Sequence, residues 1–176
     1  RAAFENGAYK EVGELARGAT SAADGPRLAY LAGEAQLVLG APVEAEASFR
    51  AVLAQRPQAL PAQVGLGRAL CEQQRFDEAG KTLEAALKTD PKDVGALTAH
   101  GLLASLLGRS EEARKELARA HELDPQNALT VRGYVEVLLR VDDTPTAAAV
   151  IEGFEQAHPK HPLGPFLLAW TMELDG

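Results

Sequence analysis

Apolar and small residues recur along this chain at the spacing of one helix face, and the whole pattern returns every 34 positions. In each copy an alanine is followed four residues later by a large apolar side chain, and a proline closes the copy. The closing prolines are Pro57, Pro91, Pro125 and Pro159. A fixed period of this length is typical of a solenoid, in which each unit is a pair of helices that packs on its neighbours.

Short turns divide each copy into two helices. Gly40-Ala41-Pro42 and Gly108-Arg109-Ser110 each separate two segments of helical periodicity, and so short a turn makes the two helices antiparallel. Side chains that accept hydrogen bonds from the first helical amides predict N-caps at Asp93, Ser110, Asn127 and Thr144. We expect one domain, 1–176, made of the second helix of a partial unit at 1–25, full units at 26–59, 60–93, 94–127 and 128–161, and the first helix of a truncated unit at 162–176.

Small residues stand where the two helices of a unit must approach each other. Packed helix axes lie about 8–10 Å apart, and the closest approaches need small facing side chains. The eighth place of the first three units holds Gly33, Gly67 and Gly101, and the twentieth place of all four holds Ala45, Ala79, Ala113 and Ala147. We expect the remaining space to be filled from the twenty-fourth place, by Phe49, Leu83, Leu117 and Ile151.

The fourth unit departs from this pattern. Val135 replaces the small residue of the eighth place, and Phe154 replaces the small residue of the twenty-seventh. Two larger side chains predict that the helices of this unit lie further apart or are rotated, around Gly133 and Gly153.

Taken together, the alanine, the large apolar residue, the small residue and the proline in a helix–turn–helix of 34 residues resemble the tetratricopeptide repeat (TPR). The resemblance covers nearly the whole chain. It implies an all-α fold, a right-handed superhelical solenoid of antiparallel helix pairs. The first helices differ from the family pattern, because the place of its tryptophan holds Ala29, Gln63, Leu97 and Val131.

The resemblance also implies a binding site. In this family the first helices of successive units line a concave groove that commonly binds an extended peptide or a partner helix. Carried over to the second, fifth, ninth and twelfth places, and to the helix after residue 161, the predicted groove residues are Arg27, Tyr30, Glu34, Leu37, Val64, Arg68, Cys71, Thr98, Leu102, Ser105, Leu129, Arg132, Glu136, Leu139, Leu163, Phe166 and Trp170.

Two interpretations of these groove residues stay open. Arg68 and Arg132 could each hold a ligand carboxylate through the planar guanidinium, or Arg132 could pair with Glu136 one turn later, a contact of little weight at a surface. The apolar members could face solvent as a contact surface, or the subset Val64, Leu102 and Leu139 could pack between units.

Composition and charge narrow the class of partner. The net charge of −7 and pI near 5.1, without a basic run, argue against nucleic acid. No apolar run approaches the ~18 residues of a membrane-spanning helix. The alanine-rich, lysine-poor composition suggests a bacterial source.

Candidate chemistry is sparse. We expect a core role for His100 and no metal at His158 and His161, since no set of ligands stands beside them. Cys71 has no base or triad partner in its vicinity in the sequence, and we expect Arg68, three residues earlier, to lower its pKa slightly. We therefore expect no enzyme activity and no cofactor.

The sequence favours a non-catalytic scaffold that binds another protein or a peptide in its concave groove. Two alternatives stay open: a structural scaffold that self-assembles through its open terminal half-units, and an accessory module of a larger enzyme or of a secretion or envelope-assembly machine. The chain begins at Arg1, which we interpret as a fragment or a processed product, and both the cytoplasm and the periplasm stay open as its location.

Overall fold

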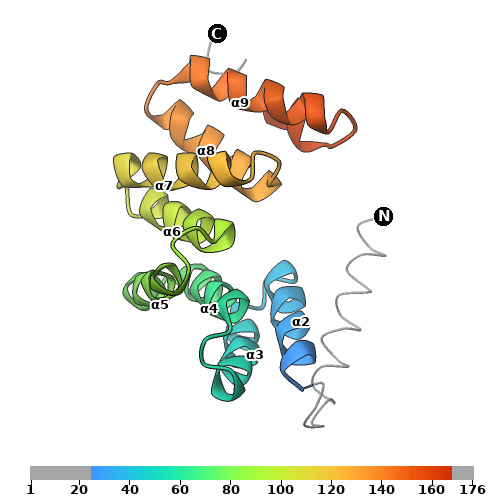
Figure 1. Cartoon of the computed structure of the whole chain (residues 1–176), viewed down its shortest axis with the longest axis vertical. Helices are drawn as coiled ribbons and strands as arrows, with labels where there is room; N and C mark the ends of the chain where they lie inside the picture. Colours follow the sequence, from blue (N-terminus) through green and yellow to red (C-terminus); the bar gives the residue numbers. More distant parts are fainter. Residues whose placement is uncertain (1–24, 168–176) are drawn as a thin grey trace. The chain divides into compact units, whose positions relative to one another are not determined.

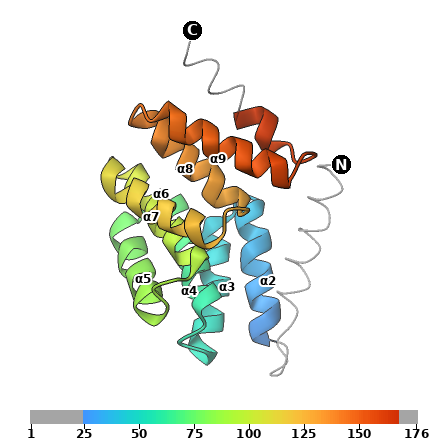
Figure 2. The ribbon, with the colours of Figure 1, turned by 45° about the horizontal axis from the view of Figure 1, so that its top comes forward.

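The computed structural model describes residues 25–167, and all regular structure within that range is helical. The chain divides into two compact units, residues 1–90 and 91–176. In each unit consecutive helices are antiparallel neighbours (Figures 1 and 2). The expected fold class, an all-α array of antiparallel helix pairs, is confirmed, whereas the assignment of all 176 residues to one domain stays a prediction.

The first unit contains two helix pairs. Its helices are α2 (Gly25–Val38), α3 (Pro42–Gln55), α4 (Leu60–Glu72) and α5 (Phe76–Thr89). Besides packing within its pair, α3 packs on α4, and α2 also reaches α4. Each pair therefore shares its apolar surface with the next, as expected for units that cannot bury both faces alone.

The second unit repeats this arrangement. Its helices are α6 (Val94–Leu106), α7 (Ser110–Leu123), α8 (Ala128–Arg140) and α9 (Thr144–Ala157), followed by a helical turn at 163–167. The second helix of one pair, α7, packs on the first helix of the next, α8, and α6 also reaches α8.

Two of the four predicted N-caps are confirmed. The side chain of Asp93 accepts from the amide of Ala96, and that of Asn127 accepts from the amide of Thr130. The predictions for Ser110 and Thr144 are wrong by one residue, because each is already the first residue of its helix. Asp143 caps α9, so the carboxylate before Thr144 takes the role that the hydroxyl was expected to have.

The turns inside the pairs share one backbone feature. Gly40, Gln74, Gly108 and Asp142, which stand 34 residues apart, all have positive φ angles between 59° and 72°. Glycine takes this conformation without steric cost, whereas a residue with a Cβ is strained. The turn geometry of the repeat is thus kept even where the sequence does not supply glycine.

The largest buried side chain of the first unit, Phe49, packs against two glycines. A Cβ added to Gly33 on α2 or to Gly65 on α4 would come within 2.7 Å and 2.5 Å of the Phe49 ring. Phe49 on α3 is fully buried, so the ring has no free space to move into. The expected close approach at the eighth place is confirmed here, and Gly65 extends it to the neighbouring pair.

In the second unit, leucine side chains likewise pack against glycine backbones at the first helix pair and at the start of the next. A Cβ at Gly101 would lie 2.7 Å from Leu117 Cγ, and a Cβ at Gly133 would lie 2.6 Å from Leu102 Cδ2 and 3.6 Å from Leu117 Cδ2. Gly133 therefore lets α8 approach the preceding pair.

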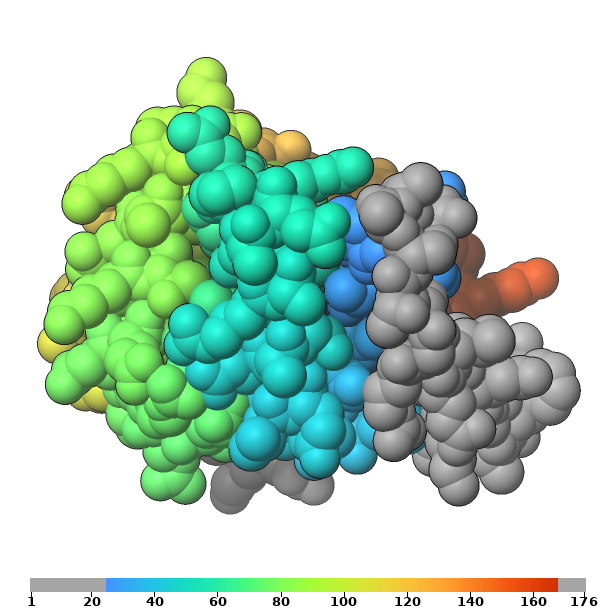
Figure 3. Space-filling model, turned by 90° about the horizontal axis from the view of Figure 1, so that it is seen from below, coloured from blue at the N-terminus to red at the C-terminus, as the bar shows by residue number. Residues whose placement is uncertain are grey.

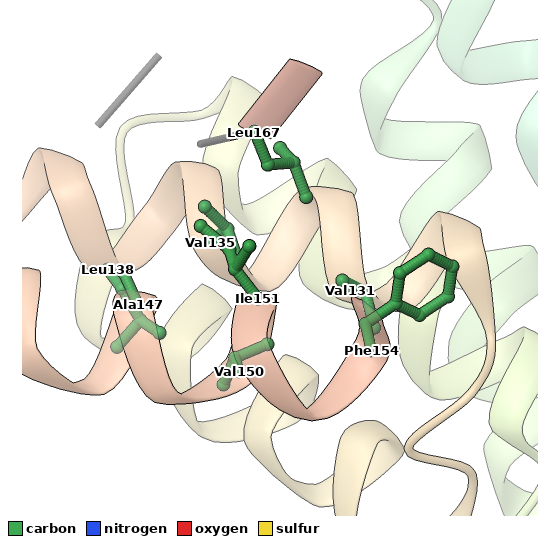
Figure 4. Packing of buried hydrophobic residues seen from close by; sticks show 8 residues of the cluster. All are labelled: Val131, Val135, Leu138, Ala147, Val150, Ile151, Phe154 and Leu167. Carbon is green, nitrogen blue, oxygen red and sulfur yellow. The ribbon is translucent and has the colours of Figure 1, made fainter. Parts of the chain in front are cut away.

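The last pair, α8 and α9, is packed differently. Its two backbones share less close contact than those of the other three pairs, as expected of helices that lie further apart or are rotated around Val135 and Phe154, which are both buried in its core (Figure 4). The expectation that this change centres on Gly133 and Gly153 is wrong. Gly133 contacts the preceding pair, and Gly153 is exposed, so that a Cβ added there would have no neighbour within 4 Å outside its own helix backbone.

A polar network joins α3 to the turn before α5 in the first unit; both helices lie in the foreground of Figure 3. Glu46 on α3 accepts from Gln73 at 2.9 Å and from Arg75 at 2.6 Å, and Arg50 donates to it within α3 at 2.8 Å. Partial burial raises the pKa of Glu46, but the hydrogen bonds from Gln73 and Arg50 and the charges of Arg75 and Arg50 outweigh it, so the net pKa lies below its ordinary value of 4.5.

The close approach at Gly65 can be tested with Gly65→Ala. The added methyl meets a rigid buried ring, and overpacking of this kind costs about 1–3 kcal/mol. Gly153→Ala is the matched control, since this glycine is also inside a helix but has open space around it; we expect it to stabilise by roughly 0.5–1 kcal/mol. Urea unfolding followed by circular dichroism measures both, and equal stabilisation by the two alanines would contradict the packing described here.

The Glu46 network predicts a pH-dependent contribution to stability. A carboxyl with a depressed folded-state pKa stabilises the fold above its unfolded pKa, and the stabilisation is lost as the pH falls through the folded pKa. We expect Glu46→Gln to cost about 1 kcal/mol at pH 7 and to cost less as the pH falls below 4.5. Glu84→Gln on the exposed side of α5 is the control, and thermal unfolding across that pH range measures both. A loss at pH 7 no greater than that of the control would exclude the network as a stabilising contact.

Candidate binding face

The predicted groove residues lie on the first helices α2, α4, α6 and α8 and on the turn after α9, and the structure separates them by exposure. Those that remain exposed are Arg27, Leu129, Arg132 and Phe166; those that are half-buried are Tyr30, Glu34, Arg68, Cys71, Leu102, Glu136, Leu139 and Leu163; those that are buried are Leu37, Val64, Thr98 and Ser105. Trp170 lies outside the described residues.

The buried members do not line an open groove. Thr98 on α6 shares a hydrogen bond of 2.7 Å with Thr130 on α8, so its hydroxyl faces the neighbouring helix. Ser105 is covered by Arg140, whose guanidinium donates to its hydroxyl at 2.7 Å and to its carbonyl at 3.1 Å. Buried hydroxyls need such partners, and both are therefore used inside the second unit.

Packing accounts for three apolar members. Val64 is buried in α4, Leu102 lies against the Gly133 backbone of α8, and Leu139 packs against the α8–α9 core. The alternative that these residues pack between units is therefore supported for Leu102, whereas Leu139 packs within its own pair and Val64 is buried.

Arg68 is already paired. Its guanidinium donates to both carboxylate oxygens of Glu34, at 3.1 and 3.3 Å, and thereby joins α4 to α2. Each side chain remains about one-third exposed, so the pair is solvent-screened and contributes little to stability. Glu34 occupies the position that a ligand carboxylate would take, and Arg68 is not an unoccupied cation.

Arg132 is in the opposite situation. It is exposed on α8, and within residues 25–167 its guanidinium forms no ion pair or hydrogen bond. The expected alternative, a pair with Glu136, is wrong because Glu136 accepts from Arg140 at 2.8 Å instead. Both pairings have helical i,i+4 spacing, so the sequence alone does not choose between them; the contact of Arg140 with Ser105 holds that guanidinium beside Glu136.

Arg132 and Leu129 together form what we call the α8 face. Leu129 is 37% exposed and lies three residues before Arg132, which puts the two side chains on neighbouring positions of one helix surface. The α8 face thus presents an apolar side chain beside a guanidinium that has five N–H donors and no acceptor within the described part of the chain.

Cys71 does not have the environment of a nucleophile. Its thiol is half-buried in α4, and burial, with a smaller effect from the charge of Glu72, raises its pKa to about 11. The expectation that Arg68 lowers this pKa is wrong. A thiol of this kind is protonated at neutral pH and is a poor nucleophile.

The histidines contact aromatic rings rather than ligand sets. His121 lies 5.7 Å from the Tyr134 ring, and burial lowers its pKa, whereas His158 and His161 both lie against Phe154. His100 is half-buried in α6, with its Nδ1 atom buried. No group of three or more potential metal ligands occurs in residues 25–167.

An open hollow of about 880 Å³ lies over the outer side of α7 and is bounded by Tyr134. Burial raises the pKa of the Tyr134 phenol. Charges of both signs line the hollow, and two of its acids are paired along the helix, Glu111 with Arg114 at 3.0 Å and Glu112 with Arg109 at 3.6 Å. The arrangement is that of a solvated helix face and favours no charged ligand class.

None of the helices described here is both long and apolar enough to cross a bilayer. This agrees with their length of 13 or 14 residues, since a membrane span needs about 20.

Comparison with known proteins identifies the repeat. Models of the tetratricopeptide repeat match residues 39–106 and residues 94–127. A curated relative, the chloroplastic protein SLOW GREEN 1 of Arabidopsis thaliana, is 37% identical over 67 residues. The match covers 38% of this chain, which spans only about a fifth of that protein, 21% of its length.

Solved structures show the same fold over most of the chain. A thermophilic TPR protein of Thermus thermophilus superposes with a TM-score of 0.83 at 19% identity, covering 96% of this chain and 90% of that protein. YrrB, described as a TPR protein with an unusual peptide-binding site, superposes with a TM-score of 0.59 at 20% identity and covers 80% of this chain and 73% of its own.

The two matching models together span residues 39–127, and the helix pairs follow one another with the 34-residue period of the sequence. This chain belongs to the tetratricopeptide repeat family.

Proposed function

We propose that this chain is a non-catalytic scaffold that binds a segment of another protein, and that the α8 face of its second unit makes the decisive contact. Membership of the TPR family supports the general role, and YrrB is a structural neighbour that is described as having a peptide-binding site. The observation that carries the proposal is the pairing pattern of the two predicted arginines: Arg68 is paired with Glu34, whereas Arg132 is exposed and has no partner in residues 25–167.

Charge complementarity indicates the partner. A guanidinium without an internal carboxylate favours a ligand carboxylate, which it can hold through two parallel hydrogen bonds. Leu129 beside it favours an apolar side chain at the next position of the ligand. We therefore propose a peptide segment that carries an aspartate or glutamate next to an aliphatic residue.

The negative net charge of the chain increases the selectivity of binding at Arg132. At −7 overall, the chain repels an acidic partner at long range, although physiological salt screens charges beyond about 8 Å. Attraction is then confined to the surroundings of an exposed, uncompensated cation. The repulsive background and the local attraction at Arg132 together discriminate between partners, because specificity is a difference between two binding free energies.

A selection from a library of random twelve-residue peptides displayed on phage tests the proposal. The baits are the native chain, Arg132→Glu on the α8 face, and Arg119→Glu, which makes the same charge change on the exposed side of α7. Circular dichroism establishes that all three are equally helical.

We expect the native chain and Arg119→Glu to enrich the same peptides, with an acidic residue beside an aliphatic one. Binding of those peptides to Arg132→Glu should weaken at least about tenfold, the effect of roughly 1.4 kcal/mol, because a charge-assisted hydrogen bond is replaced by repulsion. Equal binding to both variants would reject the α8 face as the site, and enrichment of no peptide by the native chain would reject linear peptides as its ligands.

A further inference from the structure

The chain beyond α9 folds back on the core of the last helix pair. The connection 158–162 leads into the helical turn 163–167, where Leu167 is fully buried in the cluster formed by α8 and α9 and Leu163 packs against the same cluster. Figure 4 shows Leu167 reaching from that turn toward Val135 and Ile151. Docking of this turn therefore covers apolar surface that α8 and α9 do not bury by themselves.

An imidazole caps the start of this turn. His161 Nδ1 accepts a hydrogen bond of 3.1 Å from the backbone amide of Leu163, and the His161 amide donates to the His158 carbonyl at 2.9 Å. The His161 ring stands edge-on to the buried Phe154 ring, with the ring centres 5.2 Å apart. The side chain thus connects the core of α9 with the first amide of the turn.

The cap requires one protonation state. A backbone amide can only donate, so Nδ1 must keep its lone pair, which it does only in the neutral imidazole. Protonation would turn Nδ1 into a donor that faces another donor, and it would place a positive charge at the N-terminal end of a helical turn, where the backbone dipole disfavours it. Imidazoles change charge between about pH 5 and 8.

The charges around His161 do not change the conclusion that its protonation weakens the cap. His158, with its ring centre 6.3 Å from that of His161, adds positive charge when it is protonated, and Lys160 stands between them in the connection. Glu155 on α9 lies against the Gly164 backbone and is the carboxylate that opposes the effect. From α8, the titratable side chain packed against this cluster is Tyr134, a phenol that stays neutral in this range.

We propose that His161 is a pH-sensitive latch, which holds the turn 163–167 on the α8–α9 core when it is neutral and releases it when it is protonated. Opening exposes Leu167 and the cluster beneath it, and so creates an apolar surface on the last pair under mildly acidic conditions. The proposal is independent of the α8 face and of any peptide ligand.

Amide hydrogen exchange measured by NMR tests the latch on the whole chain. The probes are the amides of Leu163 and Leu167, compared at pH 7.5 and pH 5.5 after correction for the intrinsic exchange rate. Loss of a side-chain cap raises the equilibrium constant for local opening of the turn about fivefold. We expect the corrected exchange rates of these amides in the native chain to rise by this factor at the lower pH.

Two substitutions separate the latch from other effects of acid. His161→Asn keeps an acceptor oxygen at the cap but cannot be protonated, so its corrected exchange should be the same at both pH values. His158→Asn leaves the cap intact and should respond to pH as the native chain does. A native chain without the pH response, a His161→Asn chain that retains it, or a His158→Asn chain that loses it would each overturn the proposal.

Discussion

The close approach of helix backbones at glycine and alanine positions is the constraint on which the rest of the structure depends. Phe49 can be fully buried only because Gly33 and Gly65 present no side chain to its ring, from two different helices. The Phe49 ring therefore joins its own pair to the next one. In the second unit two side chains divide this role, because Leu117 packs on Gly101 of its own pair and Leu102 packs on Gly133 of the next pair. Contacts of this kind connect the two helix pairs inside each unit, so the stability of each pair depends on the other pair of its unit.

With the apolar core defined by these contacts, the polar side chains divide into two groups. Some are used inside a unit: Glu46 is held by Gln73 and Arg75, Arg68 by Glu34, and Ser105 by Arg140. A group that already has a partner must lose it before it can bind a ligand, which reduces any gain in binding free energy. The exposed and uncompensated Arg132 has no such cost, and for this reason we propose the α8 face, rather than the equivalent surface around Arg68, as the binding site.

The last pair shows what happens when the small residue is absent. With Val135 at the eighth place, the backbones of α8 and α9 share less close contact, and their core is completed by Leu167 from the following turn. The burial of that core then depends on a segment whose start is capped by the side chain of His161. The His161 side chain, which lies in the connection after α9, thereby affects the packing of α8 and α9.

The sequence by itself determined the repeat, the helix pairs, the small-residue contacts and the caps at Asp93 and Asn127, because these depend on local spacing and on the size of single residues. It did not determine which side chains of the first helices are free. Arg68 and Arg132 looked alike in the sequence, as did the two possible partners of Glu136, because equal helical spacing allows both pairings. Only the tertiary structure brought Glu34 to Arg68 and Ser105 to Arg140, from residues 34 and 35 positions away, and burial of Cys71 raised a pKa that its sequence neighbour Arg68 was expected to lower. Local patterns therefore determine which elements form, whereas the pairing and solvation of polar groups depend on contacts between elements, which the sequence does not reveal.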